Sequence, residues 1–224
     1  MMDRNHYSLP VADVETHKPT INTDERWKTF IQTLFLNPPV VKAFNELGKV
    51  PNWANFSQDQ NLAMITYSAS VPLALQDDIT PLDWDMVSIP MFPDLPNIGT
   101  QSTPVYFGVT SFSEHKDEAV QVIKFLTSIE YMSEVSKGGR LMASTAPEVV
   151  NVLGTESPFP DKNWGAITYY PFAPLADKGV YSAKVLSVYN SHIPSIISQE
   201  VDLNTALRTM EEEALLVIEE ELKK

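Results

Sequence analysis

Apolar residues recur at helical spacing near the start of the chain. Four of them follow an i, i+3, i+4, i+7 pattern that predicts a helix: Trp27, Phe30, Ile31 and Leu34. Thr23 is a suitable N-cap, because Asp24 and Glu25 then fall in the first turn.

Pro38-Pro39 predicts the start of a second helix that ends at Gly48. We expect this second helix to bury Val40, Val41, Phe44 and Leu47. Residues 1–22 show no clear period and are expected to be irregular.

Helical patterns also dominate the second half of the chain. A helix is predicted to follow Ser113 or Glu114, with the stripe Ala119, Val122, Ile123 and Leu126. Ser128 is expected to cap a short helix that ends at Gly138-Gly139. Further helices are predicted over 145–154 and over 181–198, the latter bent at Pro194. The last helix follows Asp202 as its cap, with an apolar face of Leu203, Ala206, Leu207, Met210, Ala214 and Val217.

Three short apolar runs have the length and composition of strands. They cover residues 62–67, 84–90 and 105–110, and Pro90 closes the second of them. Short strands that alternate with helices are typical of layered α/β proteins. The pattern therefore predicts an α/β fold in which helices dominate.

Composition and charge exclude several classes of protein. Apolar residues make up 43% of the chain and charged residues 20%, as in soluble globular proteins. No apolar run approaches the ~20 residues that a bilayer span needs. The formal net charge of -13 disfavours nucleic acid and anionic lipid as partners. The absence of cysteine excludes disulfides, thiolate metal sites and a cysteine nucleophile.

The sequence offers little for catalysis or cofactor binding. It contains no phosphate loop, dinucleotide fingerprint, HExxH motif or nucleophile elbow. The four histidines are scattered, at His6, His17, His115 and His192. We therefore expect no cofactor and no metal. Asp83 and Asp85 flank Trp84 and would share one face of a strand, which leaves open a glycoside-active hydrolase that uses this carboxylate pair.

Aromatic residues in loops point to a carbohydrate ligand. Sugar rings stack their apolar faces on Trp and Tyr, while their hydroxyl groups need polar neighbours. Tyr67 with Ser68 offers this combination, as do Trp164 beside Asn163 and the pair Tyr169-Tyr170. A structural or interaction domain without a cleft, with Trp164 and Tyr170 packed inside, is the remaining alternative.

Four segments resemble, in order, family 1 extracellular solute-binding proteins, the receptors of ABC sugar importers. Residues 56–70 are similar to the family's F-x-x-G-K-A-A-M strand, although Asp59-Gln60-Asn61 replaces the glycine and lysine. Residues 84–90 are similar to its strand into the hinge, and 201–222 resemble its C-terminal helix. The closest match lies within 107–130, through the sequences HKDEA and FLTSIE.

This resemblance implies a binding protein and not an enzyme, with a periplasmic-binding-protein-like (type II) fold of two α/β lobes. It places residues 1–92 and 141–224 in a helix-rich second lobe. It further implies that residues 100–138 form an excursion into a first lobe, most of which would be missing. The helix of this excursion should then expose an apolar face through Val122 and Ile123.

The resemblance also implies a ligand, partners and a location. The ligand would be a sugar or oligosaccharide, contacted at positions carried over from the family: Tyr67, Ser68, Trp164, Tyr170 and Tyr181. The implied partners are the membrane permease subunits of an ABC transporter, together with self-association through the incomplete lobe. The full-length parent would be extracellular and membrane-anchored, although this chain shows no signal peptide or lipobox.

Overall fold

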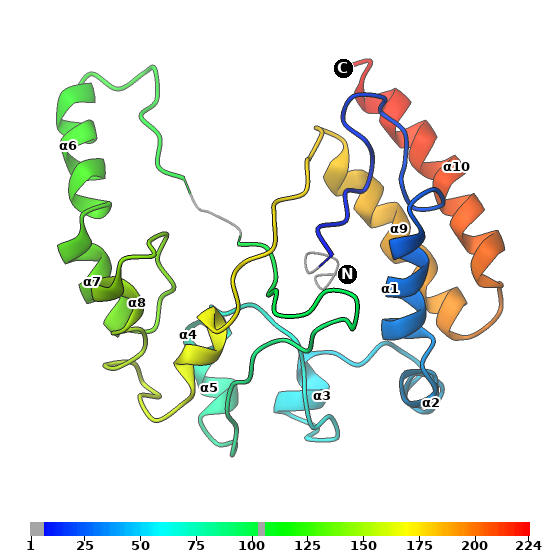
Figure 1. Ribbon diagram of the computed structural model, residues 1–224, viewed down its shortest axis with the longest axis horizontal. Coiled ribbons are helices and arrows are strands. Elements are labelled where there is room, and N and C mark those ends of the chain that lie inside the picture. Colours follow the sequence, from blue (N-terminus) through cyan, green and yellow to red (C-terminus); the bar gives the residue numbers. More distant parts are fainter. Residues whose placement is uncertain (1–6, 103–105) are drawn as a thin grey trace. The chain divides into compact units, whose positions relative to one another are not determined.

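The structure is a computed structural model, and it describes residues 7–102 and 106–224. Its regular elements are helices (Figure 1). In chain order they are α1 (Glu25–Phe35), α2 (Pro38–Leu47), α3 (Trp53–Ser57), α4 (Val71–Ala74), α5 (Gln76–Ile79), α6 (Lys116–Leu126), α7 (Ile129–Lys137), α8 (Pro147–Val150), the 3₁₀ helix η2 (Trp164–Thr168), α9 (Ser182–Ile197) and α10 (Leu203–Glu221). The described residues contain no β-strand, and Ala12 and Pro19 form only an isolated bridge.

The predicted α/β, periplasmic-binding-protein-like (type II) fold is therefore wrong. The three runs expected to be strands are irregular over their described residues, 62–67, 84–90 and 106–110. Apolar composition favours an extended backbone, but a strand exists only when a neighbouring backbone pairs with it. In these runs the described residues provide no such partner.

The chain divides into two compact units. Unit 1 comprises Met1–Ile65 and Ala173–Lys224, and unit 2 comprises Thr66–Phe172. These boundaries differ from the lobe boundaries implied by the resemblance, which fall near residues 92–100 and 138–141. The lobe assignment itself stays a prediction.

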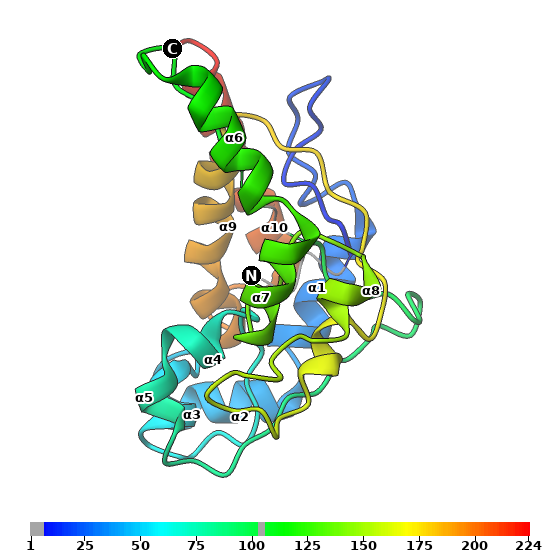
Figure 2. The ribbon, with the colours of Figure 1, turned by 90° about the vertical axis from the view of Figure 1, so that its left-hand side faces the viewer.

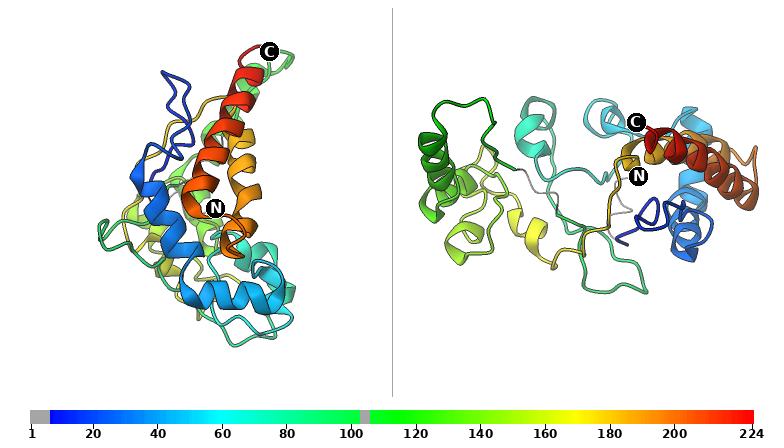
Figure 3. Two further views of the ribbon diagram at one scale, coloured as in Figure 1. Left: turned by 90° about the vertical axis from the view of Figure 1, so that its right-hand side faces the viewer. Right: turned by 90° about the horizontal axis from the view of Figure 1, so that it is seen from above.

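Unit 1 is organised around α9 and α10, which pack along each other (Figure 3), while α1 packs against α9. The buried face of α10 consists of Ala206, Leu207, Met210, Ala214 and Ile218. The predicted stripe is confirmed at these positions apart from Ile218, which was not predicted, whereas the predicted Leu203 and Val217 are half-buried. The stretch before α1 also belongs to this core, because Tyr7, Leu9, Val11, Ala12 and Ile21 are buried. The described residues of this stretch are irregular, as expected, and yet they contribute to the core.

Unit 2 contains a small helical group in which α7 contacts both α6 and α8 (Figure 2). No residue of α6 is buried, and the Val122 side chain is 56% exposed. The predicted apolar exposure of this helix is confirmed at Val122, whereas Ile123 is half-buried.

Helix caps follow simple local rules, with one correction. Ser128 caps α7 by accepting the Tyr131 N–H, and Gly48 ends α2 with a φ of 65°. The cap of α1 is Asp24, whose carboxylate accepts the Arg26 N–H, and not Thr23. The predicted burial by α2 was also wrong, because this helix has no buried residue.

Acid should destabilise the protein through the aspartate caps of α1 and α10. Hydrogen bonds from the Arg26 side chain hold the pKa of Asp24 below its ordinary value of 3.8, and those from Thr205 do the same for Asp202. A lowered folded pKa means that the stabilisation is complete above a pH of about 5 and is lost as the pH falls through the folded value.

An Asp202→Asn variant separates this effect from general acid unfolding, since asparagine also caps helices but does not titrate. We expect its melting temperature, measured by circular dichroism from pH 6 to pH 2, to depend less on pH than that of the parent. Identical pH profiles would contradict a role for the Asp202 carboxylate.

Candidate functional site

Trp164 is held inside unit 2. It opens η2, its side chain is only 4% exposed, and its indole N–H donates to the Phe159 carbonyl over 2.8 Å. Gly139 and Gly154 lie against the ring, and both have positive φ, at 94° and 78°. A Cβ atom on Gly139 would lie 2.6 Å from the indole. The ring faces are thus covered by protein in this structure, so Trp164 acts as a packing residue here.

Tyr181 is held inside unit 1, at the start of α9. Its side chain is 1% exposed, and its hydroxyl donates to the Asp13 carbonyl over 3.4 Å. The same hydroxyl lies 3.1 Å from Nδ1 of His17, and the two rings meet edge to face. Burial raises the pKa of Tyr181 above its ordinary value. Tyr181 and the other predicted contact residues therefore belong to different units.

The remaining predicted contacts are accessible and belong to unit 2. Tyr67 is 52% exposed, and the exposed Ser68 hydroxyl lies 3.0 Å from that of Ser70. Tyr170 is half-buried beneath its neighbour Tyr169, whose ring is 71% exposed. The two rings are edge to face, with centroids 4.7 Å apart. The more exposed ring of this pair is thus that of Tyr169. The family resemblance implied a contact at Tyr170 and not at Tyr169, although the sequence analysis noted both tyrosines.

A backbone hydrogen bond holds the loop that carries this tyrosine pair. The Gly99 N–H donates to the Pro171 carbonyl over 2.8 Å, which ties residue 171 to a distant part of unit 2. Gly99 closely approaches Tyr170, because a Cβ atom on it would lie 3.5 Å from the Tyr170 carbonyl. The backbone of residues 170–171 is therefore anchored while the Tyr169 ring remains exposed.

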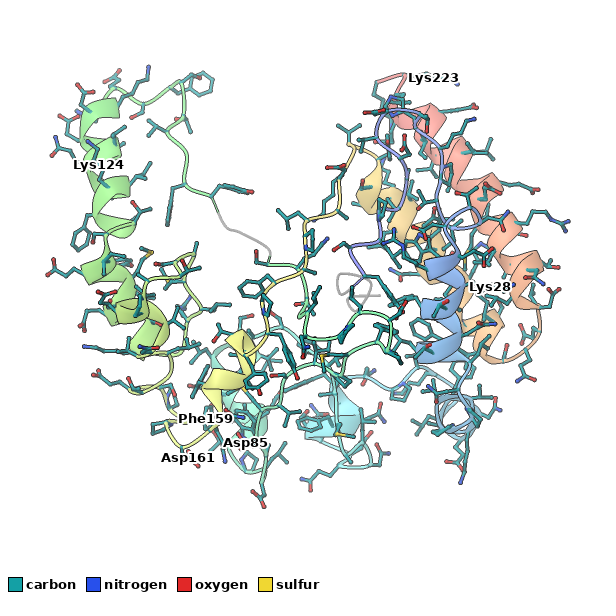
Figure 4. The ribbon with its side chains drawn as sticks, in the orientation of Figure 1. Lys28, Asp85, Lys124, Phe159, Asp161 and Lys223 are labelled. Atoms are coloured by element: carbon teal, nitrogen blue, oxygen red, sulfur yellow. The ribbon has the colours of Figure 1, made fainter. Side chains whose placement is uncertain are left out.

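One carboxylate of the predicted pair, that of Asp85, is engaged in backbone hydrogen bonds. Oδ1 of Asp85 accepts two backbone N–H groups, from Asn163 and Met86, at 2.7 Å each. These bonds hold the pKa of Asp85 below its ordinary value. Figure 4 shows Asp85 beside the loop of Phe159 and Asp161 that it anchors. A carboxylate kept ionised in this way is suited to fixing a loop and not to donating a proton near neutral pH.

Two surface hollows lie away from the predicted contact residues. These shallow hollows in unit 1, of about 460 and 310 Å³, share Leu36 and Gln199 in their walls. None of the predicted contact residues lines them. Within residues 7–102 and 106–224, no group of three His, Asp or Glu side chains could hold a metal ion. None of the described helices has the length and apolar character to cross a membrane.

Comparisons with protein-family models, with curated proteins and with solved structures found no match to this chain.

Proposed function

We propose that this chain is the C-terminal portion of the substrate-binding component of an ABC importer and that it contacts a sugar or oligosaccharide. The observation that carries the proposal is the Tyr169–Tyr170 pair, which presents a 71% exposed ring from an anchored loop. A ring held in this way can stack on the apolar face of a sugar at little entropic cost. Tyr67 and Ser68 supply a second exposed aromatic ring and a hydroxyl group in the same unit.

The helix–turn–helix of unit 2 supports the same proposal at a local level. The FLTSIE sequence, which carries the closest resemblance to solute-binding proteins, ends α6 at Leu126 and begins α7 at Ile129 with Ser128 as its cap. The proposed partners are membrane permease subunits, with self-association through the apolar face of α6. The proposed location of the full-length parent is extracellular and membrane-anchored.

Oligosaccharides should bind this chain weakly, because exposed rings cover only part of a ligand and good sites bury most of its surface. We expect an oligosaccharide panel to raise the melting temperature of the full-length parent but barely that of this chain. In NMR titrations of this chain, the ring signals of Tyr169 and Tyr67 should shift. Tyr169→Ala should weaken these shifts, whereas Phe112→Ala, which removes a 93% exposed ring elsewhere, should not.

The absence of any tyrosine shift with every oligosaccharide would overturn this proposal. A large rise in the melting temperature of this chain alone would instead overturn the idea that it holds only half of a binding site. Turnover of chromogenic glycosides that is lost in Asp83→Asn would favour the hydrolase instead. Asp83 is the better position for this test, because replacing Asp85 would also remove its hydrogen bond from the Asn163 N–H and so change the loop.

A further inference from the structure

Residues 83–88 of unit 2 show the side-chain pattern of a strand, although the described residues provide no partner strand for them. Asp83, Asp85 and Val87 are exposed, whereas Trp84, Met86 and Ser88 between them are half-buried. This period of two is that of an extended backbone with one face on a core. The half-buried face packs on the loop before and within η2, since Trp84 meets Phe159 edge to face at 5.3 Å. On the same face, the Ser88 hydroxyl donates to the Ala166 carbonyl over 2.9 Å.

The backbone of this segment is free to pair. Within the described parts of the chain, no backbone group of residues 83–91 is hydrogen-bonded to another backbone group. In an extended chain the N–H and C=O of one residue point to the same edge, and those of the next residue to the opposite edge. One edge therefore carries the unpaired groups of residues 83, 85, 87 and 89. On the other edge, the Met86 N–H is already taken by the Asp85 carboxylate.

We propose that residues 83–89 form a strand-addition site, which takes up an extended peptide with basic side chains at alternate positions. Main-chain hydrogen bonds to an open edge give affinity in this mode of recognition, and the alternating side chains give selectivity. In this site, the N–H and C=O groups of residues 83, 85, 87 and 89 form the ladder.

The negative charge of this segment favours a peptide with basic side chains. The exposed face carries Asp83 and Asp85, and the sequence has no lysine or arginine between Lys49 and Lys116. Lys162 reaches this region, with Nζ 5.6 Å from the centroid of the Trp84 ring. The Asp85 carboxylate is already held by the Asn163 and Met86 N–H groups and lies in the field of Lys162. Asp83, which forms no ion pair among the described residues, is therefore the carboxylate of this face that contributes most to selecting the occupant. Opposite charges across a strand pair stabilise the pair, and like charges destabilise it.

A second copy of residues 83–89 is a less favourable partner, because it would bring aspartates together. Each chain also carries a net charge of -13. A basic strand is therefore favoured.

The test uses the whole chain and a capped peptide of alternating lysine and valine. Peptide addition should protect the amides of residues 85, 87 and 89 from hydrogen exchange, and not those of residues 84 and 88. A peptide with glutamate in place of lysine should bind at least about tenfold more weakly, and the difference should shrink at high salt. We take the peptide to pair antiparallel, so that the lysines opposite Asp83 and Asp85 also point their N–H groups toward this edge. N-methylation of the lysine amides should then abolish binding, whereas N-methylation of the valine amides should not.

Val87 provides the matched variants, since its side chain is 79% exposed. Val87→Pro removes one N–H from the pairing edge and should weaken peptide binding about tenfold. Val87→Thr keeps that N–H and should bind like the parent. Equal binding by both N-methylated peptides, or protection of residues 85–89 in the free chain, would overturn the proposal. So would a concentration-dependent dimer in sedimentation that Val87→Pro abolishes, because the occupant would then be a second copy.

Discussion

Replacing Trp164 by alanine is expected to lower the free energy of unfolding of unit 2 by about 3–5 kcal/mol. The indole is 4% exposed and lies against Gly139 and Gly154, so its removal leaves a cavity between two loops. The Phe159 carbonyl also loses its donor. The measurement is chemical denaturation followed by tryptophan fluorescence. Tyr169→Ala is the control, since this ring is 71% exposed in the same unit and should change stability by less than about 1 kcal/mol.

A double-mutant cycle with Gly154 isolates the contact behind this effect. A Cβ atom on Gly154 would overlap the Trp164 ring, and the φ of 78° adds backbone strain for any L-residue. Gly154→Ala should therefore destabilise the parent clearly but the Trp164→Ala variant much less, because the cavity accepts the added methyl group. We expect a coupling of about 1–2 kcal/mol. If the stability losses of the two single variants simply add in the double variant, Gly154 is not needed for the packing of Trp164.

Replacing Trp27 by alanine should destabilise unit 1 by a similar amount, about 3–5 kcal/mol. The Trp27 ring is fully buried and meets Phe30 and Tyr189 edge to face, with centroids 6.0 and 5.5 Å away. Its indole N–H donates to the Thr20 hydroxyl over 3.0 Å. One side chain thus joins the segment before α1, α1 itself and α9, so its loss should loosen all three.

Segment-resolved hydrogen exchange checks the Trp27 prediction. Protection should fall in α1 and α9 and in residues 7–21, more than in α7. Gln32→Ala is the matched control, because Gln32 is exposed on the same helix and alanine is a strong helix former. A Trp27→Ala variant as stable as this control would mean that the buried ring contributes little to unit 1.

The helices of this protein were predictable because their signals are local. A cap, a periodic stripe and a terminating glycine all lie within a few residues of one another, as in α7 between Ser128 and Gly138. The strands failed for the opposite reason. Residues 84–90 have strand composition and a period of two, but pairing depends on a backbone that lies far away in sequence.

The candidate site was predictable only in part. The exposed Tyr67 and the Tyr169–Tyr170 pair could be seen as loop aromatics in the sequence. The burial of Trp164 and Tyr181 could not, because it arises from residues distant along the chain. Gly139 covers Trp164 from 25 positions away, and Asp13 accepts the hydroxyl of Tyr181 from 168 positions away. An aromatic residue in a loop looks the same in sequence whether its ring is covered or exposed.

The sequence by itself determined where the longer helices lie, the acidic character of the chain and its lack of cysteine chemistry. Only the tertiary structure decided that the stretch before α1 enters a core and that the backbone of residues 83–91 has no backbone partner among the described residues. The reason is physical. Capping and helical hydrogen bonds close within one turn, whereas burial and strand pairing require surfaces that meet only after the whole chain has folded.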